Sequence, residues 1–313
     1  MFIVDDIQTL RARLAEWRRE NLRIALVPTM GNLHAGHHAL IEHARARADR
    51  VVTSIFVNPI QFDRAADLAA YPRTMEADLA QLRDLKTDLV FAPASETIYP
   101  QGMVHTTRVV VPQLAEILEG ESRPGHFAGV ATVVAKLFNL VQPDVAVFGE
   151  KDYQQLLVIR RLAAELNFAV EIEGLPTVRE ADGLAMSSRN RNLNEDERAH
   201  ASGLYACLRA LGDCIRVGER DFDRLQAQTM HMLSAQGLRP DYVSVLDACD
   251  LSVPNGRSRE IVILGAVWLG RTRLIDNIRV TLMDSYLSPI IRGSSAAGST
   301  PDTQPSTHMR KHT

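Results

Sequence analysis

Cysteine is scarce in this chain of 313 residues, which contains three of them, and this scarcity argues against two kinds of site. Cys207, Cys214 and Cys249 form no CxxC pair, so their spacing indicates neither a disulfide framework nor a zinc site. Cys207 and Cys214 lie in a pattern typical of a helix, where we expect both to be small buried hydrophobic residues. No group of His, Cys and acidic residues has the spacing of a transition-metal site.

An excess of charge of one sign is also absent. The 35 Lys and Arg residues nearly balance the 38 Asp and Glu residues, which gives a formal net charge of −3 and a pI near 6.4. Such a chain has no general attraction for nucleic acid or for anionic membranes. We therefore expect neither as a partner, and any phosphate must be bound by a local site.

Long hydrophobic runs are missing as well, although 46% of the residues are hydrophobic. The longest apolar run, 261–269, is too short to cross a bilayer. No basic and apolar leader opens the chain, so we expect a cytoplasmic protein. The composition is that of an ordinary globular protein, long enough for one large domain or two smaller ones.

Up to Pro176, short apolar segments alternate with amphipathic ones. Apolar strands that are buried on both faces and alternate with helices indicate an α/β fold with a Rossmann-like, doubly wound parallel sheet. Ligands bind such sheets at the carboxyl ends of the strands. The expected strands are 23–27, 51–57, 89–91, 145–148 and 170–172. The chain is expected to open with a helix that has Ile7, Leu10, Leu14 and Trp17 on one face. The other expected helices are 37–47, 74–85, 129–141 and 153–166.

The pattern changes after Pro176. A long helix is expected from a cap near Asn194, because acidic residues fill its first turn. A helix over 222–235 and strands over 242–246 and 261–268 follow, which predicts a smaller α+β C-terminal domain. The expected domains are therefore 1–176 and 177–283, followed by a tail, 284–313, whose Ser, Pro, Thr and Gly content predicts disorder.

The segment Pro28–His37, with the sequence PTMGNLHAGH, joins an expected strand to an expected helix. A glycine-containing loop that leads from a strand into a helix N-terminus is suited to an anion, because free backbone N–H groups and the helix dipole point at it. His34 and His37 are three residues apart and share one face if helical geometry begins there. Without this context, the two histidines would be interpreted as ordinary solvent-facing residues.

Two later segments also offer groups for an anion. Gly149–Asp152 follows a strand and begins a helix, but it is not a Walker A loop, because the upstream glycine is missing and Asp152 stands where Ser or Thr is required. No GxGxxG opens a helix either, which argues against a dinucleotide enzyme. The hydroxyl groups and the arginine of Met186–Asn190 suit a triphosphate. Taken alone, Lys151 could be an exposed lysine and Met186–Asn190 a polar linker.

Longer blocks carry a resemblance to a known family. The HxGH pattern after a strand resembles the signature of nucleotidyl transferases and class I aminoacyl-tRNA synthetases, and MSSRN resembles their second, KMSKS-type signature. Five blocks resemble the pantothenate synthetase (pantoate–β-alanine ligase) family and stand in its order, over roughly residues 1–280. They are PTMGNLHAGH, FVNPIQF, YPRTMEADL, RPGHFAGVATVVAKLFNLVQPDVAVFGEKDYQQ and PTVREADGLAMSSRN.

The resemblance implies a homodimer that joins (R)-pantoate to β-alanine with ATP. The pantoate carboxylate would attack the α-phosphorus of ATP, giving pantoyl adenylate and pyrophosphate. The β-alanine amine would then attack the adenylate and release pantothenate and AMP. Mg²⁺ is expected with the ATP, held mostly by phosphates and water, and no protein ligand is assigned to it.

The resemblance also implies roles for individual residues on the ATP side. His34, His37, Lys151 and Arg189 are expected to be catalytic, with His37 near the reacting α-phosphate. Positioned donors of this kind stabilise the charge that builds on phosphate oxygens. The residues expected to bind ATP are Met30, Gly31, His34, His37, Gly149, Glu150, Lys151, Asp152, Val178, Met186, Ser187, Ser188 and Arg189.

On the pantoate side, Gln61 and Gln155 match the family's pantoate-binding glutamines, Asn58 joins them, and Gln61 is also expected to meet β-alanine. Neutral amides suit this task, because a bidentate arginine would stabilise the charge of the carboxylate and weaken the nucleophile. The segment Asp63–Arg73 is expected to be a flap that keeps water from the adenylate.

Two other functions stay open at this stage. Another adenylate-forming enzyme, such as a small aminoacyl-tRNA synthetase-like ligase, would need a nucleic-acid surface, which the charge balance disfavours. A nucleotide-binding regulator could keep the fold without turnover, although every expected polar position is filled.

Overall fold

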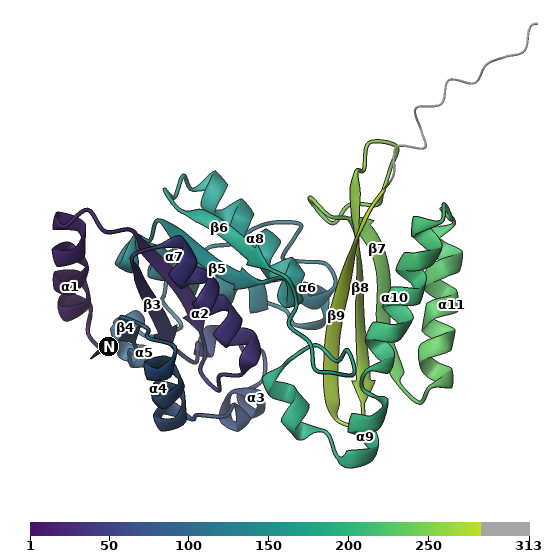
Figure 1. Ribbon diagram of the computed structural model, residues 1–313, viewed down its shortest axis with the longest axis horizontal. Helices are drawn as coiled ribbons and strands as arrows, with labels where there is room; N and C mark the ends of the chain where they lie inside the picture. The colour runs from purple at the N-terminus through teal and green to yellow at the C-terminus, as the bar shows by residue number, and fades with distance from the viewer. Residues whose placement is uncertain (283–313) are drawn as a thin grey trace, which may run out of the picture. The chain divides into compact units, whose positions relative to one another are not determined.

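The computed structural model describes residues 1–282, and the expected disordered tail, 284–313, lies outside the described residues. The larger sheet has the strand order β1-β4-β3-β2-β5-β6, and every neighbouring pair is parallel (Figure 1). The predicted α/β fold with a doubly wound parallel sheet is confirmed. The strands are β1 (Phe2–Val4), β2 (Ile24–Thr29), β3 (Arg50–Ile55), β4 (Leu89–Phe91), β5 (Val145–Gly149) and β6 (Glu171–Leu175).

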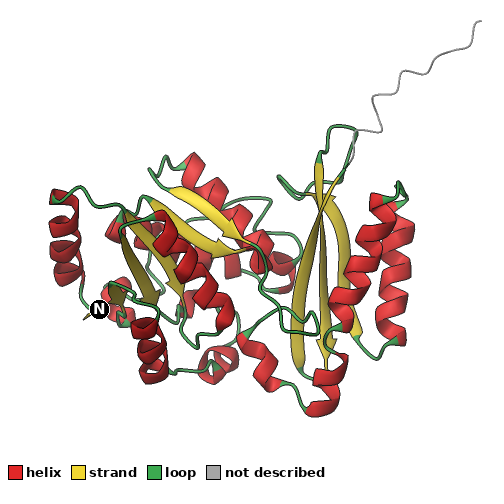
Figure 2. Cartoon of the chain, viewed as in Figure 1, coloured by secondary structure: helices red, strands yellow, loops and turns green. Residues whose placement is uncertain are grey.

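Helices cover both faces of this sheet, because its central strands are apolar on both sides (Figure 2). In β2, Ile24 and Leu26 pack on one face and Ala25 and Val27 on the other, as the alternation of a strand requires. The first face carries α1 (Ile7–Arg19), α7 (His126–Val141) and α8 (Tyr153–Glu165), and the second carries α2 (Ala35–Arg47) and α4 (Met75–Asp84). Within residues 1–282, no helix is long and apolar enough to cross a membrane.

The order of the strands places a crevice between β2 and β5. From β2 the chain builds outward through β3 and β4, and it then returns to add β5 and β6 on the opposite side of β2. At such a reversal, the loops after the two central strands diverge and leave room for a ligand. The connections that follow β3, β4 and β5 contain the short helices α3 (Ala65–Ala70), α5 (Ser95–Ile98) and α6 (Glu119–Ser122) and the 3₁₀ turns η1 (Pro59–Gln61) and η2 (Glu150–Asp152).

A second, antiparallel sheet of β7 (Arg239–Asp247), β8 (Glu260–Leu269) and β9 (Thr272–Thr281) follows the turn η3 (Ser188–Asn192). Its helices α10 (Gly203–Arg216) and α11 (Phe222–Ala235) cover one face, where Ile261 and Ile263 of β8 are buried (Figure 1). Val262 and Leu264 of the same strand join the core of the larger sheet. The strand β8 is therefore buried on both faces.

The structure differs from the sequence prediction in a few elements. The long helix expected after Asn194 is two helices, α9 (Glu195–His200) and α10. Asn194 caps α9 as predicted, but the helix is interrupted just before Gly203. Glycine is a poor helix former, and a Cβ added at this position would lie 2.5 Å from the Gln236 side chain. The strands β1 and β9 were not predicted. The expected burial of Cys214 is wrong, because it lies near the end of α10 and is exposed, whereas Cys207 is buried.

Candidate active site

A cavity of about 920 Å³ opens at the carboxyl ends of β2, β3 and β5. Its wall combines the loops after these strands with the segment Thr177–Asn192 that leads to the second sheet. A cavity of this size can hold a ligand as large as a nucleotide together with a small acid. The polar segments that follow these strands therefore meet at one edge of the sheet.

His34 and His37 form a reciprocal cap at the start of α2. The His34 Nδ1 atom accepts the Gly36 N–H at 3.1 Å, and the His37 Nδ1 atom accepts the His34 N–H at 3.4 Å. The ring centroids lie 4.1 Å apart. Because each Nδ1 is an acceptor, the proton of each neutral ring is on Nε2, which leaves two Nε2–H donors in the cavity wall.

Both histidines are held neutral. Burial first, and the charge of Lys151 second, lower the pKa of His34 from 6.5 to about 4. Burial and the neighbouring His34 lower the pKa of His37 from 6.5 to about 3. At neutral pH the pair therefore donates hydrogen bonds without a fixed positive charge, and its fixed tautomers need no rearrangement when a ligand binds.

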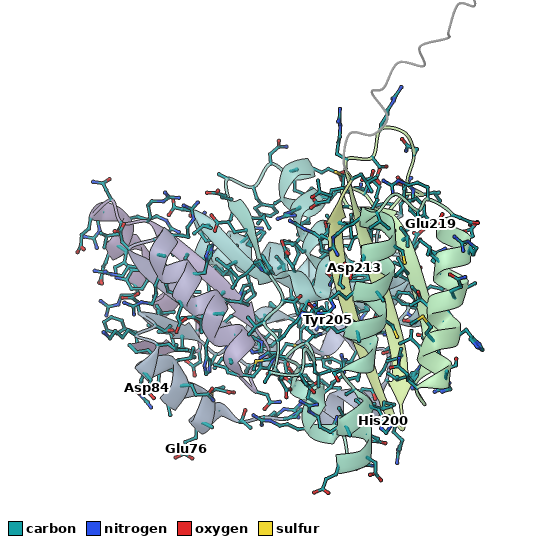
Figure 3. The ribbon with its side chains drawn as sticks, turned by 45° about the vertical axis from the view of Figure 1, so that its right-hand side comes forward. Glu76, Asp84, His200, Tyr205, Asp213 and Glu219 are labelled. Carbon is teal, nitrogen blue, oxygen red and sulfur yellow. The ribbon has the colours of Figure 1, made fainter. Side chains whose placement is uncertain are left out.

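The carboxylate of Asp78, on α4, holds the loop before His34 by hydrogen bonds. This carboxylate, 1% exposed, accepts the N–H groups of Asn32 at 2.9 Å and Leu33 at 2.8 Å. In contrast, Glu76 and Asp84 of the same helix are exposed (Figure 3). Gly31 has a φ of +78°, and a Cβ there would lie 2.9 Å from the Asp78 carboxylate, so its part in the site is to let the loop pass Asp78.

The turn η2 presents Lys151 and Asp152 to the cavity. The Lys151 Nζ lies 3.5 Å from Asp152 Oδ1, and the Asp152 side chain is 48% exposed. Enclosure by the protein raises the pKa of Asp152, but the charges of Lys151 and Arg189 outweigh this and leave the pKa below its usual value. Glu150 is turned away from the cavity and pairs with Arg279 at 3.1 Å.

The segment before α9 meets the loop after β2. The Ser188 hydroxyl donates to Asn32 O at 3.3 Å, and Arg191 donates to Asn32 Oδ1 at 2.9 Å. Ser187 caps the turn η3 by accepting the Arg189 N–H at 3.3 Å. These contacts bring the hydroxyl groups and the arginine of this segment to the same cavity as His34 and His37.

A buried chain of amides forms another part of the wall. The Tyr99 hydroxyl donates to Asn58 Oδ1 at 2.6 Å, which orients the amide so that Asn58 Nδ2 donates to Gln61 Oε1 at 2.9 Å and to Gly129 O at 3.1 Å. Both N–H groups of Asn58 are therefore used by the protein. The Gln61 Nε2 atom donates one N–H to the Met30 sulfur at 3.1 Å, which leaves its second N–H for a ligand.

His126 and Arg123 support Gln61 from the other side, and neither was predicted to be a site residue. The His126 Nδ1–H donates to Gln61 O at 2.8 Å, and Arg123 donates to His126 Nε2 at 3.2 Å. Burial first, and the charge of Arg123 second, lower the pKa of His126 to about 4. The only signal for them was their place in the RPGHF block. With Glu119, they line the cavity.

The expected flap contains the short helix α3. Asp63, Arg64, Asp67, Ala70, Tyr71 and Pro72 of this segment line the cavity. The Tyr71 ring meets the Phe62 ring edge-on, with centroids 5.8 Å apart, so an aromatic pair stands at this wall. Burial raises the pKa of the Tyr71 hydroxyl, and it is therefore protonated at neutral pH.

The structure gathers nearly all the expected site residues around one cavity. Gly31 and Glu150 do not line it: Gly31 lies behind the loop and Glu150 faces Arg279. The expected residues that line the cavity are Met30, His34, His37, Asn58, Gln61, Gly149, Lys151, Asp152, Gln155, Val178, Met186, Ser187, Ser188 and Arg189.

A parallel sheet with a reversal of strand order, a helix start suited to an anion and a Ser/Arg segment across the cavity are together typical of a nucleotide-binding α/β protein. The sequence profile of the pantoate–β-alanine ligase family matches residues 2–279. The chain belongs to this family, as the sequence predicted.

Named relatives and solved structures agree with this assignment. The chain is 58% identical to a pantothenate synthetase of Thioalkalivibrio sulfidiphilus over 276 residues, which is 88% of this chain and 96% of that protein. Pantothenate synthetase from Thermus thermophilus superposes with a TM-score of 0.82 at 44% identity, covering 89% of this chain and 99% of the other. The ligase of Francisella tularensis, described as complexed with beta-gamma ATP and beta-alanine, has a TM-score of 0.73 at 35% identity, over 89% and 97% of the two chains.

Proposed function

We propose that the chain condenses (R)-pantoate with β-alanine at the expense of ATP, through pantoyl adenylate, and forms pantothenate, AMP and pyrophosphate. The observation that carries this function is that one cavity brings together two kinds of group. Neutral Nε2–H donors of His34 and His37 and the Lys151 ammonium suit phosphates, and the amides of Gln61 and Gln155 suit a small hydroxy acid.

In the first step, an oxygen of the pantoate carboxylate attacks the α-phosphorus of ATP and pyrophosphate leaves. His34, His37, Lys151 and Arg189 donate to phosphate oxygens, where charge accumulates in the transition state. Gln61 and Gln155 hold pantoate without neutralising its carboxylate, so the nucleophile keeps its strength. We assign Asn58 to this step through its hydrogen bond to Gln61.

In the second step, the β-alanine amine attacks the carbonyl carbon of the adenylate, and AMP leaves with the electron pair of the broken C–O bond. Gln61 meets both substrates in this proposal. The flap Asp63–Arg73 keeps water from the adenylate between the steps. Because no covalent bond to the protein forms, the residues act by positioning and by stabilising charge.

The other ATP contacts follow the wall of the cavity. The backbone of Val178 would contact adenine, and Asp152 would accept from ribose hydroxyl groups. Met30, Gly149, Met186, Ser187 and Ser188 would lie along the nucleotide, whereas Gly31 and Glu150 would contribute through the backbone of their loops.

Mg²⁺ would accompany ATP and neutralise part of the phosphate charge. Among residues 1–282, no group of three or more His, Cys, Asp or Glu side chains could hold a metal ion by itself. We propose that the cation is held mainly by phosphate oxygens and water, without an assigned protein ligand.

We propose further that residues 1–176 form the ATP- and pantoate-binding domain and residues 177–283 the smaller domain that closes over ATP. The family resemblance supports a homodimer that works in the cytoplasm on small molecules, with no nucleic-acid or membrane partner. Light scattering in solution tests the dimer.

The function is tested by incubating the protein with ATP, Mg²⁺ and either pantoate or amino acids. With pantoate and no β-alanine, labelled pyrophosphate should exchange into ATP, because the adenylate forms before the amine is used. Adding β-alanine should then release AMP and pantothenate. Exchange that requires an amino acid would favour a synthetase-like ligase, and ATP binding without exchange would favour a regulator.

A further inference from the structure

Two adjacent polar residues of β9 are buried where the second sheet meets the ATP side of the cavity. Asp276 and Asn277 are 4% and 5% exposed. Burying such groups is costly unless each is hydrogen-bonded. Both find their partners in segments that carry proposed ATP-binding residues, and neither segment belongs to the sheet of β9.

Asn277 holds the turn that carries Lys151. Its Nδ2 donates to Glu150 O at 2.8 Å and to Lys151 O at 2.9 Å, so both amide protons are used on consecutive carbonyl groups of η2. A carbonyl oxygen has two lone pairs, so each of these two groups can accept from Asn277 in addition to a bond within the turn. The orientation of the turn, and with it the direction of the Lys151 side chain, therefore depends on Asn277.

Asp276 holds the segment that carries Val178. Its two oxygens accept from Arg179 at 2.6 and 3.0 Å. Arg179 also donates to Gly183 O at 3.1 Å, and its guanidinium lies 3.7 Å from the centre of the Tyr205 ring. Tyr205 belongs to α10 (Figure 3). Because Val178 O accepts the Met186 N–H at 2.9 Å, this anchor also fixes the chain that enters Ser187–Arg189.

We propose that Asn277 is a positioning residue of the adenylation step, and that with Asp276 it sets the spacing between Lys151 and the Val178–Arg189 segment across the nucleotide. This inference rests on the proposed function. Because neighbouring residues of β9 hold both segments, the distance between the two segments is set by the backbone of this strand. A misplacement of about 1 Å can cost roughly a hundredfold in rate.

The competing explanation is a purely structural tie between the sheets. Such a tie exists nearby, since the Tyr153 hydroxyl donates to Ala248 O at 2.8 Å and is buried. Tyr153→Phe removes one hydrogen bond between α8 and the loop after β7, and it leaves the hydrogen bonds to the carbonyl groups of η2 in place. It is therefore the matched control.

The test compares Asn277→Asp, which keeps the shape but puts an oxygen against two carbonyl oxygens, with Asn277→Ser, which keeps one donor. Single-turnover formation of pantoyl adenylate should fall about ten- to a hundredfold in Asn277→Asp and by less in Asn277→Ser. Tyr153→Phe should stay within about twofold of the wild type, because the amide ties to η2 remain. The melting temperature of each variant shows whether it folds.

A double-mutant cycle with Lys151→Met separates positioning from structure. If Asn277 acts through Lys151, adding Asn277→Asp to Lys151→Met should lower the rate of adenylate formation by less than about a further threefold. An equal fold-loss in both backgrounds would overturn the inference, as would wild-type adenylation in Asn277→Asp. A wild-type protein without pantoate-dependent exchange would instead refute the proposed function.

Discussion

Replacing Lys151 with Met should depress adenylation far more than stability. Met keeps the aliphatic stem and removes the charge that meets the phosphates. Losing one transition-state interaction of this kind typically costs about 3–4 kcal/mol, or roughly a hundred- to a thousandfold in rate. The Lys151 Nζ lies 3.5 Å from Asp152 Oδ1, but the Asp152 side chain is 48% exposed. Such a solvent-accessible pair contributes only about 0–1 kcal/mol to folding.

The assay is single-turnover formation of pantoyl adenylate, with urea unfolding measured on the same samples. Lys86→Met is the control, because Lys86 is exposed beyond the end of α4 and should be nearly silent in both measurements. Near wild-type adenylation in Lys151→Met would remove Lys151 from the chemistry. A loss of stability as large as the loss of transition-state binding would make it a structural residue.

Three further predictions concern residues around the cavity. Burial lowers the pKa of His126 from 6.5 to about 4, so its contribution to stability is complete above pH 6.5 and falls by up to about 3 kcal/mol toward pH 4. The urea midpoint of His126→Asn should therefore change less between these pH values than that of the wild type, and an equal change in both proteins would contradict this. Gly31→Ala should lower stability by about 1–3 kcal/mol, because φ is +78° and a Cβ would lie 2.9 Å from Asp78; an unchanged melting temperature would refute it. Tyr99→Phe removes the 2.6 Å hydrogen bond that orients Asn58, and steady-state kinetics should show about a tenfold higher KM for pantoate with the KM for ATP unchanged.

The larger sheet was predictable because each of its central strands carries its own signal. The run Ile24–Val27 is apolar at every position, and both faces of the sheet need apolar residues. The strand β9 carries no such signal. Asp276 and Asn277 interrupt its apolar pattern, and their partners Arg179 and Lys151 lie 97 and 126 positions away in the chain. Their burial follows from tertiary contacts that a local pattern does not contain.

The site shows the same division. His34 and His37 stand in a segment whose glycine, strand and helix start all indicate an anion site. His126 was passed over, because its partner is the backbone carbonyl of Gln61, 65 positions away. Asn58 was expected on the same side of the site as Gln61, and the two side chains are hydrogen-bonded. The hydrogen bonds of Asn58 to Tyr99 and Gly129 are visible only in the structure.

The double burial of β8 bears on how this protein could be dissected or recombined. Cutting the chain after Pro176 would remove Val262 and Leu264 from the core of the larger sheet and leave the Tyr153 hydroxyl without its Ala248 acceptor. A fragment made of the first sheet alone would therefore present an uncovered apolar surface and tend to aggregate. Exchanging residues 177–282 with those of a relative would require the core residues that share a cluster with Val262 and Leu264 to be exchanged too. This shared core therefore limits which single substitutions the protein can accept.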